Sequence, residues 1–152
     1  QVQEFNIIVV GVGGGGLIAG IATAIKALKP SVKIYGVEPA GAAKMRRSLD
    51  EGHAVRLDRV DTIADGLAPP MAGEHTYPIV KALVDEVLTV SDDEIVIAMK
   101  MLMSRAKLMV EPAGAAAVGA LLAGKIKVPG GSRVVAVISG GNVDLDELKH
   151  LL

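Results

Sequence analysis

The sequence has no cysteine, no tryptophan and few aromatic side chains: Phe5, Tyr35 and Tyr77. Without cysteine, disulfides and thiolate chemistry are excluded, and we expect a reducing compartment, the cytoplasm. Three scattered rings provide no platform on which nucleic-acid bases could stack. The net charge is −1 over 152 residues, and no basic run stands out. We therefore expect no nucleic-acid partner.

An uninterrupted hydrophobic helix is also missing. Residues 5–25 carry no charge, and Gly16 and Gly20 form a G-x-x-x-G pair, so a membrane helix is a formal candidate. Six glycines between positions 11 and 20 would fray such a helix, and its β-branched residues precede its alanine-rich ones. The segment therefore predicts a strand, a loop and a helix, with no membrane association.

The glycine-rich stretch near the N-terminus organises the rest of the chain. Ile7 to Val10 are four β-branched residues typical of a buried strand, and a helix is predicted over 17–28. Between them lie the consecutive glycines Gly13, Gly14, Gly15 and Gly16. Glycines let successive backbone N–H groups converge, and a helix N-terminus adds unpaired donors and partial positive charge. The stretch predicts an anion site.

Strands alternate with helices along the remaining chain. The expected elements are a strand at 32–37, a helix at 42–51 with a solvated basic face (Lys44, Arg46, Arg47), a weak edge strand or loop at 54–60, a helix at 77–84, a strand at 86–90, a helix at 91–107 opened by a Ser91–Glu94 capping box, a helix at 113–122, a buried strand at 134–138 and a helix at 144–151. Met99, Met101, Met103 and Met109 are expected in the core. This order predicts a single α/β domain, three-layered and Rossmann-like, with a mainly parallel sheet and helices on both faces.

Two strands of this sheet end in glycine clusters, at 13–16 and at 139–142. Ligands bind at the carboxyl ends of the strands in such sheets. If the clusters are neighbours, one could hold a phosphate while the other presents a hydroxyl to a flat ring. A dinucleotide site is the alternative, because Gly11, Gly13 and Gly16 satisfy G-x-G-x-x-G and Glu38 stands where a ribose-binding acid belongs. A structural module that has lost its ligand is a third interpretation.

Five segments occur together in a recognisable order: Gly13–Leu17, Gly36–Pro39, Thr62–Gly66, Lys107–Ala115 and Ser139–Asp144. They closely resemble the threonine dehydratase (threonine ammonia-lyase) and serine racemase group of pyridoxal-phosphate enzymes, which have the tryptophan-synthase-β-like fold, called fold type II. The resemblance covers essentially the whole chain. The dinucleotide interpretation leaves the segments at 62–66, 111–115 and 139–142 unexplained.

The resemblance implies a role for particular residues. The amides of Gly13, Gly14, Gly15, Gly16 and Leu17 would hold the phosphate of pyridoxal 5'-phosphate. Ser139 would hydrogen-bond the pyridine nitrogen, and a neutral hydroxyl there makes the ring a weaker electron sink, which suits elimination. Gly66 and Glu111 would line the pocket.

No metal site is expected. Some members of the group bind a divalent cation through residues placed as Glu38, Ala42 and position 44 are, but position 44 is a lysine here. The three histidines are too dispersed for a metal cluster and are expected at the surface; they are His53, His75 and His150.

Two motifs that the group has upstream of its glycine loop are not found upstream of Gly13 in this sequence: the Ser-x-Lys-x-Arg-Gly segment with the Schiff-base lysine, and the Ser-x-Gly-Asn substrate loop. No lysine here has a comparable setting, and Lys107, the nearest candidate, is expected to be structural. By resemblance, residues 1–152 are one segment of the large domain, without its N-terminal strands, small domain or regulatory domain. The parent reaction would be β-elimination of L-threonine or L-serine to 2-oxobutanoate or pyruvate plus ammonia. We expect the chain alone to be inactive, with no catalytic residue of its own, and to work with an N-terminal half or partner subunit in a homo-oligomer.

Overall fold

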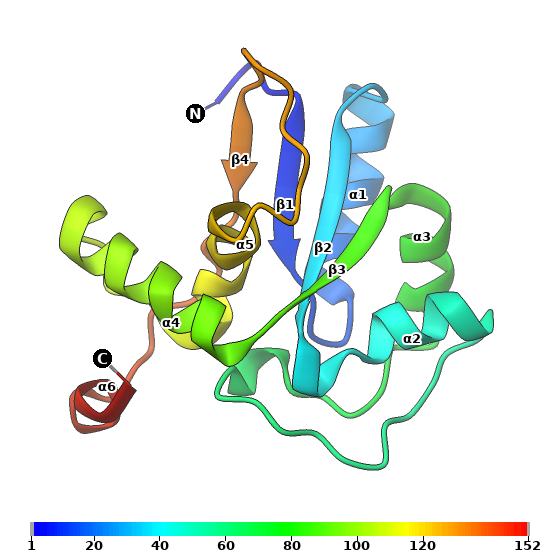
Figure 1. Ribbon diagram of the computed structural model, residues 1–152. Helices are drawn as coiled ribbons and strands as arrows, with labels where there is room; N and C mark the ends of the chain where they lie inside the picture. The colour runs from blue at the N-terminus through cyan, green and yellow to red at the C-terminus, as the bar shows by residue number, and fades with distance from the viewer. Residues whose placement is uncertain (1, 152) are drawn as a thin grey trace.

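A parallel four-stranded sheet with the strand order β3-β2-β1-β4 forms the centre of the molecule, and helices pack on both of its faces (Figure 1). The structure, a computed structural model, describes residues 2–151 apart from the side chain of residue 147. Its elements are β1 (Ile7–Gly11), α1 (Gly16–Leu28), β2 (Lys33–Pro39), the 3-10 turn η1 (Ala40–Ala42), α2 (Lys44–Glu51), the 3-10 turn η2 (Asp65–Leu67), α3 (Thr76–Leu83), β3 (Glu86–Val90), α4 (Asp92–Met101), the π-helical turn η3 (Leu102–Ala106), α5 (Pro112–Leu122), β4 (Val134–Ala136) and α6 (Leu145–Leu151).

Each face of the sheet carries its own hydrophobic core. Along β1, Ile7 and Val9 point into the core shared with α4 and α5, whereas Ile8 and Val10 point into the core shared with α1 and α3. All five residues of β1 are buried. A strand that is buried on both faces carries consecutive apolar residues, which explains the uninterrupted pattern of β1. The predicted three-layer α/β class is confirmed.

The strand order changes direction at β1. From β1 the chain crosses to β2 and then to β3 on one side, and it returns through α4 and α5 to place β4 on the other side of β1. Ligands in open parallel sheets bind outside the carboxyl ends of strands at such a switch point. The two glycine clusters follow β1 and β4, so the topology brings them to the same place.

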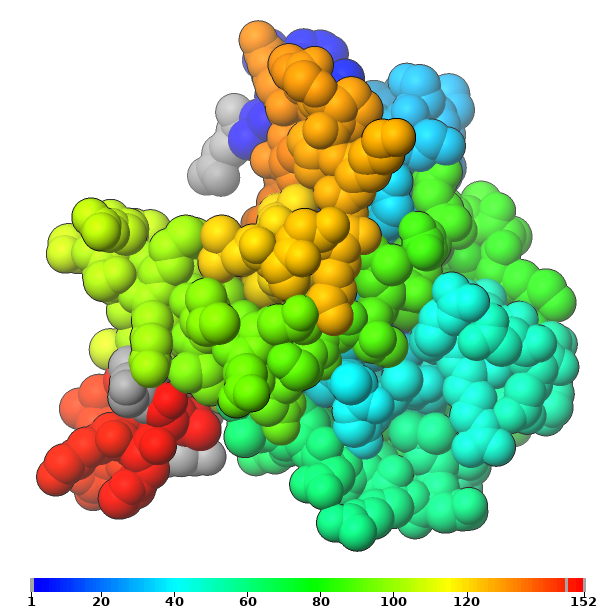
Figure 2. All heavy atoms as spheres, viewed as in Figure 1, coloured from blue at the N-terminus to red at the C-terminus, as the bar shows by residue number. Residues whose placement is uncertain are grey.

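At the periphery, α6 projects beside α4 (Figure 2).

Residues 5–25 fold as a strand, a glycine loop and a helix, as predicted. The helix, α1, has 13 residues. Within residues 2–151, no helix combines the length and the apolar character needed to cross a lipid bilayer.

Local signals at the ends of the helices agree with the structure. At the start of α4, the Glu94 amide donates to the Ser91 hydroxyl at 3.2 Å, and the Ser91 amide donates to the Glu94 carboxylate at 2.8 Å. This is the predicted capping box. Pro112 is the first residue of α5, where its missing N–H costs nothing. Just beyond that helix, Gly124 has a φ of 67°.

The end of one helix, the end of one strand and one core assignment differ from the prediction. The helix expected to reach residue 107 ends at Met101 and continues as the π-helical turn, after which Lys107 adopts a left-handed φ of 59°. The chain then leaves the core, so Met109 is 55% exposed rather than buried. β4 is shorter than 134–138 and half-buried because it is the edge strand. Residues 54–60, for which an edge strand or a loop was predicted, are a loop with one isolated bridge, from Arg56 to Met71.

The basic face predicted for α2 is wrong in one respect. Arg47 is exposed and pairs with Glu51 one turn later, as expected for a solvated cation. Lys44, in contrast, has no exposed surface. Its ammonium is surrounded by oxygen atoms from segments distant in sequence, and these contacts replace the water that a lysine otherwise requires.

Candidate functional site

The four glycines between β1 and α1, here called the glycine loop (Gly13–Gly16), differ in what surrounds them. A Cβ atom on Gly13 would lie 2.9 Å from the carbonyl oxygen of Gly66, so this glycine permits a close backbone contact. Gly15 has a φ of 92° and is the N-cap of α1. A Cβ on Gly14 or on Gly16 would meet nothing within 4 Å. At those two positions the absence of a side chain leaves open space.

The N-terminus of α1 faces this space without a side-chain partner. Its N-cap makes no side-chain hydrogen bond, and its first turn contains no acidic residue. The first amides of any α-helix have no acceptor within the helix, and they carry the positive end of its dipole. The amides that open α1 therefore provide unpaired donors and positive potential, as an anion requires.

The glycine loop is held in place from a segment that sequence reasoning did not single out. The Gly14 carbonyl accepts hydrogen bonds from the Thr76 hydroxyl at 2.6 Å and from the Gly73 amide at 3.1 Å. These contacts fix the orientation of the loop. No local pattern marks Thr76 for this role, because its partner lies 62 positions away in the chain.

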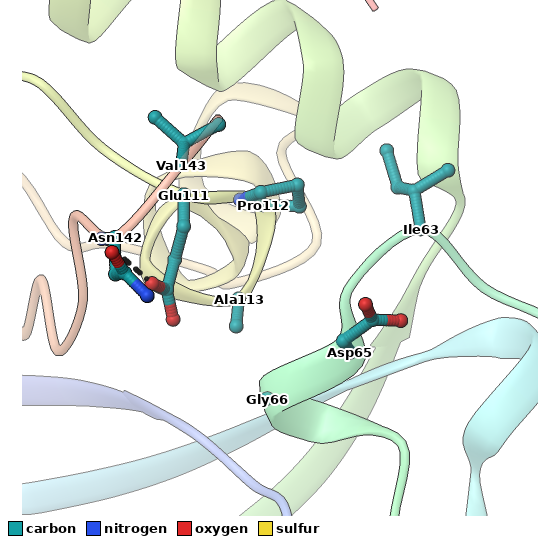
Figure 3. A pocket seen from close by; sticks show the side chains of 8 residues that line it. All are labelled: Ile63, Asp65, Gly66, Glu111, Pro112, Ala113, Asn142 and Val143. Carbon is teal, nitrogen blue, oxygen red and sulfur yellow. Dashed lines mark hydrogen bonds between the residues drawn. The ribbon is translucent and has the colours of Figure 1, made fainter. Parts of the chain in front are cut away.

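Glu111 forms the opposite wall. It is the N-cap of α5, and its amide donates to the Gly140 carbonyl at 3.3 Å. Its carboxylate accepts a hydrogen bond from the backbone amide of Asn142 at 2.9 Å, as Figure 3 shows. A Cβ on Gly140 would overlap the Glu111 carboxylate. The glycines of the 139–142 cluster thus allow the acid to approach the backbone that follows β4.

The structure brings all eight predicted cofactor-binding residues to one cavity of about 300 Å³. Its lining consists of Gly11, Gly13, Gly14, Gly15, Gly16, Leu17, Gly66, Leu67, Glu111, Ala113 and Ser139. We call it the glycine-loop cavity. A second cavity of about 270 Å³ shares Gly66, Glu111 and Ala113 with it and extends toward Asp65 and Asn142 (Figure 3).

Ser139 reaches this cavity from the end of β4 and is exposed. The adjacent residues extend the pairing of β4 with β1, since the Val137 amide donates to the Val9 carbonyl at 2.9 Å. The serine hydroxyl can therefore act on a ligand whose anionic end lies at the glycine loop, because neighbouring strands carry both groups.

The acid required by the dinucleotide interpretation is not available at this site. Glu38 has no exposed surface, and both of its carboxylate oxygens accept backbone hydrogen bonds, from Met45 at 2.9 Å and from Arg46 at 2.8 Å. It also pairs with Lys44 at 3.0 Å. A carboxylate that is buried and bonded in this way cannot reach a ribose hydroxyl.

No lysine is among the described residues that line the glycine-loop cavity. Lys107 lies instead beside an exposed groove with Met103, Leu108 and Met109, and its ammonium donates to the Ser104 carbonyl at 2.6 Å. The histidines His53, His75 and His150 are exposed, as predicted. Over the part of the chain that the structure describes, no group of three or more His, Cys, Asp or Glu could hold a metal ion.

The sequence of this chain is similar to those of known proteins. The family model described as "Pyridoxal-phosphate dependent enzyme" matches residues 1–140. A catabolic L-threonine dehydratase of Staphylococcus aureus (strain N315) is 47% identical over 154 residues, which cover 100% of this chain and 44% of that protein. An L-threonine ammonia-lyase of Geobacter sulfurreducens is 47% identical over 145 residues, or 95% of this chain and 36% of that protein.

Solved structures show the same relationship. A threonine deaminase of T.th. superposes with a TM-score of 0.88 at 40% identity, covering 93% of this chain and 48% of that one. Maize serine racemase gives a TM-score of 0.90 at 42% identity, with 99% and 48% covered. This chain thus spans less than half the length of these relatives. The resemblance is confirmed: the chain belongs to the pyridoxal-phosphate dependent enzymes of fold type II, and threonine dehydratases and serine racemases are its homologues.

Proposed function

We propose that this chain is the cofactor-binding half of a pyridoxal-phosphate-dependent L-threonine or L-serine dehydratase. The observation that carries the proposal is the glycine-loop cavity, where the N-terminus of α1 and the Ser139 hydroxyl meet from adjacent strands. The first suits a phosphate and the second a ring nitrogen. Family membership and about 47% identity to threonine dehydratases support the same assignment.

The glycine loop fits a phosphate group. Gly14 and Gly16 leave open space where side chains would otherwise stand. The amides of Gly13 to Gly16 and Leu17 would donate to the phosphate oxygens, and the dipole of α1 would stabilise their charge. Thr76 keeps the Gly14 carbonyl engaged, so the loop offers donors to an anion.

Ser139 would bind the pyridine nitrogen. When bound, the cofactor withdraws electrons from the α-carbon of an amino-acid substrate. A serine hydroxyl can donate a hydrogen bond to a neutral ring nitrogen without forcing a proton onto it, whereas a carboxylate favours the protonated ring. Ser139 would therefore keep electron withdrawal moderate, which suits elimination.

Gly66 and Glu111 would form the walls beside the ring. Gly66 lies against Ala113, whose Cβ is 2.9 Å from where a Cβ on Gly66 would stand, so no larger residue fits there without movement. The Glu111 carboxylate is oriented by the Asn142 amide. Together they limit where a flat ring can lie in the cavity.

The chemistry would require a lysine that this cavity does not contain among its described lining residues. We expect that lysine, and the remaining substrate-binding groups, to come from a further polypeptide segment or partner subunit, within a homo-oligomer. The complete enzyme would convert L-threonine or L-serine by β-elimination into 2-oxobutanoate or pyruvate plus ammonia. The chain by itself would bind the cofactor without catalysing the reaction.

Calorimetry on the 152-residue chain tests ligand choice. Pyridoxal 5'-phosphate is expected to bind roughly tenfold or more tightly than pyridoxal, which lacks the phosphate, or NAD. Micromolar binding of NAD with none for pyridoxal phosphate would establish the dinucleotide interpretation instead. Binding of neither ligand would favour a structural module.

An assay for ammonia tests the second half of the proposal. Chain incubated with pyridoxal phosphate and L-threonine should release no more ammonia than the cofactor alone. Release that Lys107→Ala abolishes would contradict the proposal, and would show that this chain has its own catalytic lysine.

A further inference from the structure

Among the lysines that the structure describes, Lys44 is the one with no exposed surface, and oxygen atoms enclose it. Its ammonium nitrogen lies 2.8 Å from the Leu67 carbonyl, 2.9 Å from the Val12 carbonyl and 3.2 Å from the Ala42 carbonyl. A carboxylate oxygen of Glu38 lies 3.0 Å away. We call these four ligands the oxygen cage. Backbone carbonyls and carboxylates are the ligands that bind hard cations in proteins.

The number of donors identifies the charge state that fits. A protonated lysine has three N–H donors for the four oxygens of the cage, whereas a neutral amine has two and would leave more of these oxygens without a hydrogen bond. The carboxylate of Glu38 supplies the balancing charge, and it accepts from two amides at the start of α2. Burial lowers the pKa of Lys44, and the Glu38 carboxylate opposes that change. Burial also raises the pKa of Glu38, and Lys44 opposes it. Every N–H of the ammonium thus has an oxygen acceptor, and each Glu38 oxygen has at least one donor.

The oxygen cage joins three segments that are separate in sequence and adjacent to the glycine-loop cavity. The Val12 carbonyl immediately precedes the glycine loop, and the Leu67 carbonyl immediately follows Gly66. Ala42 and Glu38 connect the end of β2 to α2. A single ammonium therefore fixes the backbone on which both the phosphate site and a ring wall depend.

We propose that Lys44 is a built-in cation of this chain: it fills a cation-binding oxygen cage and positions the glycine loop and the Gly66 wall. The positioning of the cofactor rests on the proposed function, but the cage does not. If the ammonium is removed, the four oxygen ligands remain. A small cation such as potassium or ammonium should then take its place, because binding to the folded state alone stabilises that state.

The first test uses Lys44→Ala and needs no cofactor. Thermal unfolding is followed in potassium chloride, in ammonium chloride and in tetramethylammonium chloride at equal ionic strength. The Tm of the variant should be higher by about 3 °C or more in potassium or ammonium than in tetramethylammonium, which is too large for the cage. The wild type and Arg47→Ala, which removes an exposed cation from the same helix, should show no such difference. If a folded Lys44→Ala variant has the same Tm in all three salts, the oxygen cage does not bind a cation and the proposal is wrong.

A second variant covers the case in which Lys44→Ala is unfolded in all three salts. Combining Glu38→Gln with Lys44→Met removes both charges and nearly preserves volume, a change that buried ion pairs often tolerate. We expect this double variant to fold and its Kd for pyridoxal phosphate to rise about tenfold or more, with Arg47→Ala unchanged. An unchanged Kd would overturn the positioning role. If the wild type does not bind pyridoxal phosphate, the proposed function is wrong. The Tm values of Lys44→Ala in the three salts still test whether the oxygen cage binds a cation.

Discussion

An ion pair between a lysine and an acid lies at each end of β2, and the two pairs differ in how far they are exposed to solvent. At the start of the strand, Lys33 pairs with Asp85 at 2.7 Å, and their side chains are 60% and 21% exposed. At the other end, Glu38 pairs with Lys44 at 3.0 Å, and both side chains are fully buried. The first pair is partly exposed to solvent, mainly on the side of Lys33. The second lies beside the glycine-loop cavity.

The difference shows where an ion pair can determine structure. Water competes with an exposed pair and screens its charges, so such pairs contribute little. A buried pair is dehydrated, and it is tolerated because its remaining donors and acceptors are all satisfied. Breaking it leaves an uncompensated charge, so the arrangement of the surrounding backbone is strongly specified. In this molecule the specified end is the end where the ligand would bind.

Lys44→Met is expected to destabilise the fold more than any change at the exposed pair. Methionine fills the space but leaves the Glu38 carboxylate without its counter-charge, so the free energy of unfolding should fall by about 3–5 kcal/mol. Urea unfolding measures the loss. Lys33→Met at the opposite end is the matched control and should change stability far less. Since methionine occupies the oxygen cage, potassium should not rescue this variant. Equal losses at both ends would contradict the distinction.

A smaller effect is expected for Gly15→Ala in the glycine loop. The left-handed φ of 92° costs a residue with a Cβ about 1 kcal/mol. The new Cβ would also lie 2.7 Å from the Thr76 hydroxyl and 2.8 Å from the Met45 methyl group. A total of about 2 kcal/mol follows, measured by urea unfolding. Gly52→Ala is the control, because Gly52 has a φ of 81° but open space around it. A loss at Gly15 no larger than at Gly52 would show that the crowding is relieved.

Ser139→Ala tests the ligand rather than the fold. Ser139 is exposed, so unfolding in urea should be unchanged. The affinity for pyridoxal phosphate should fall about fivefold, as expected from removal of one hydrogen bond worth about 1 kcal/mol. Calorimetry compares it with Ser132→Ala, a serine near the start of β4. Equal affinity in the two variants would show that Ser139 is only a turn residue.

The smallest effect concerns the exposed pair and appears as a dependence on pH. Burial by itself would raise the pKa of Asp85, but hydrogen bonds from Lys33, from the Ile34 amide and from Lys26 bring it below its ordinary 3.8. The folded state thus holds fewer protons than the unfolded state as Asp85 titrates. Its contribution to stability is present above pH 3.8 and is lost as the pH falls below that value.

Asp85→Asn should therefore lower stability slightly near pH 7 and flatten the decline below about pH 4. Urea unfolding at several pH values measures this. An unaltered acid decline in the variant would mean that other carboxylates account for it.

The sequence predicts those features whose causes are local. The capping box at Ser91 and Pro112 at the start of α5 are each specified within a few residues. The two glycine clusters could be placed together because parallel strands present their carboxyl ends at one edge. Lys44 could not be placed, since its acceptors come from three segments that only the tertiary fold assembles. The shortened β4 was missed for a related reason: an apolar pattern does not reveal that a strand lies at the edge.

The position of β4 has a consequence for the order in which this molecule forms. β1 precedes the other strands in the sequence, yet one of its two neighbours comes from residues 134–136, and the bond from the Arg133 amide to Asn6 spans 127 positions. Contacts so distant in sequence are slow to form because the entropy of closing the loop is lost first. The β1-β2-β3 part can assemble before β4 has been synthesised, and the glycine loop with it. Ser139 arrives only with β4, so the proposed contact with a ring would be the last part of the glycine-loop cavity to form.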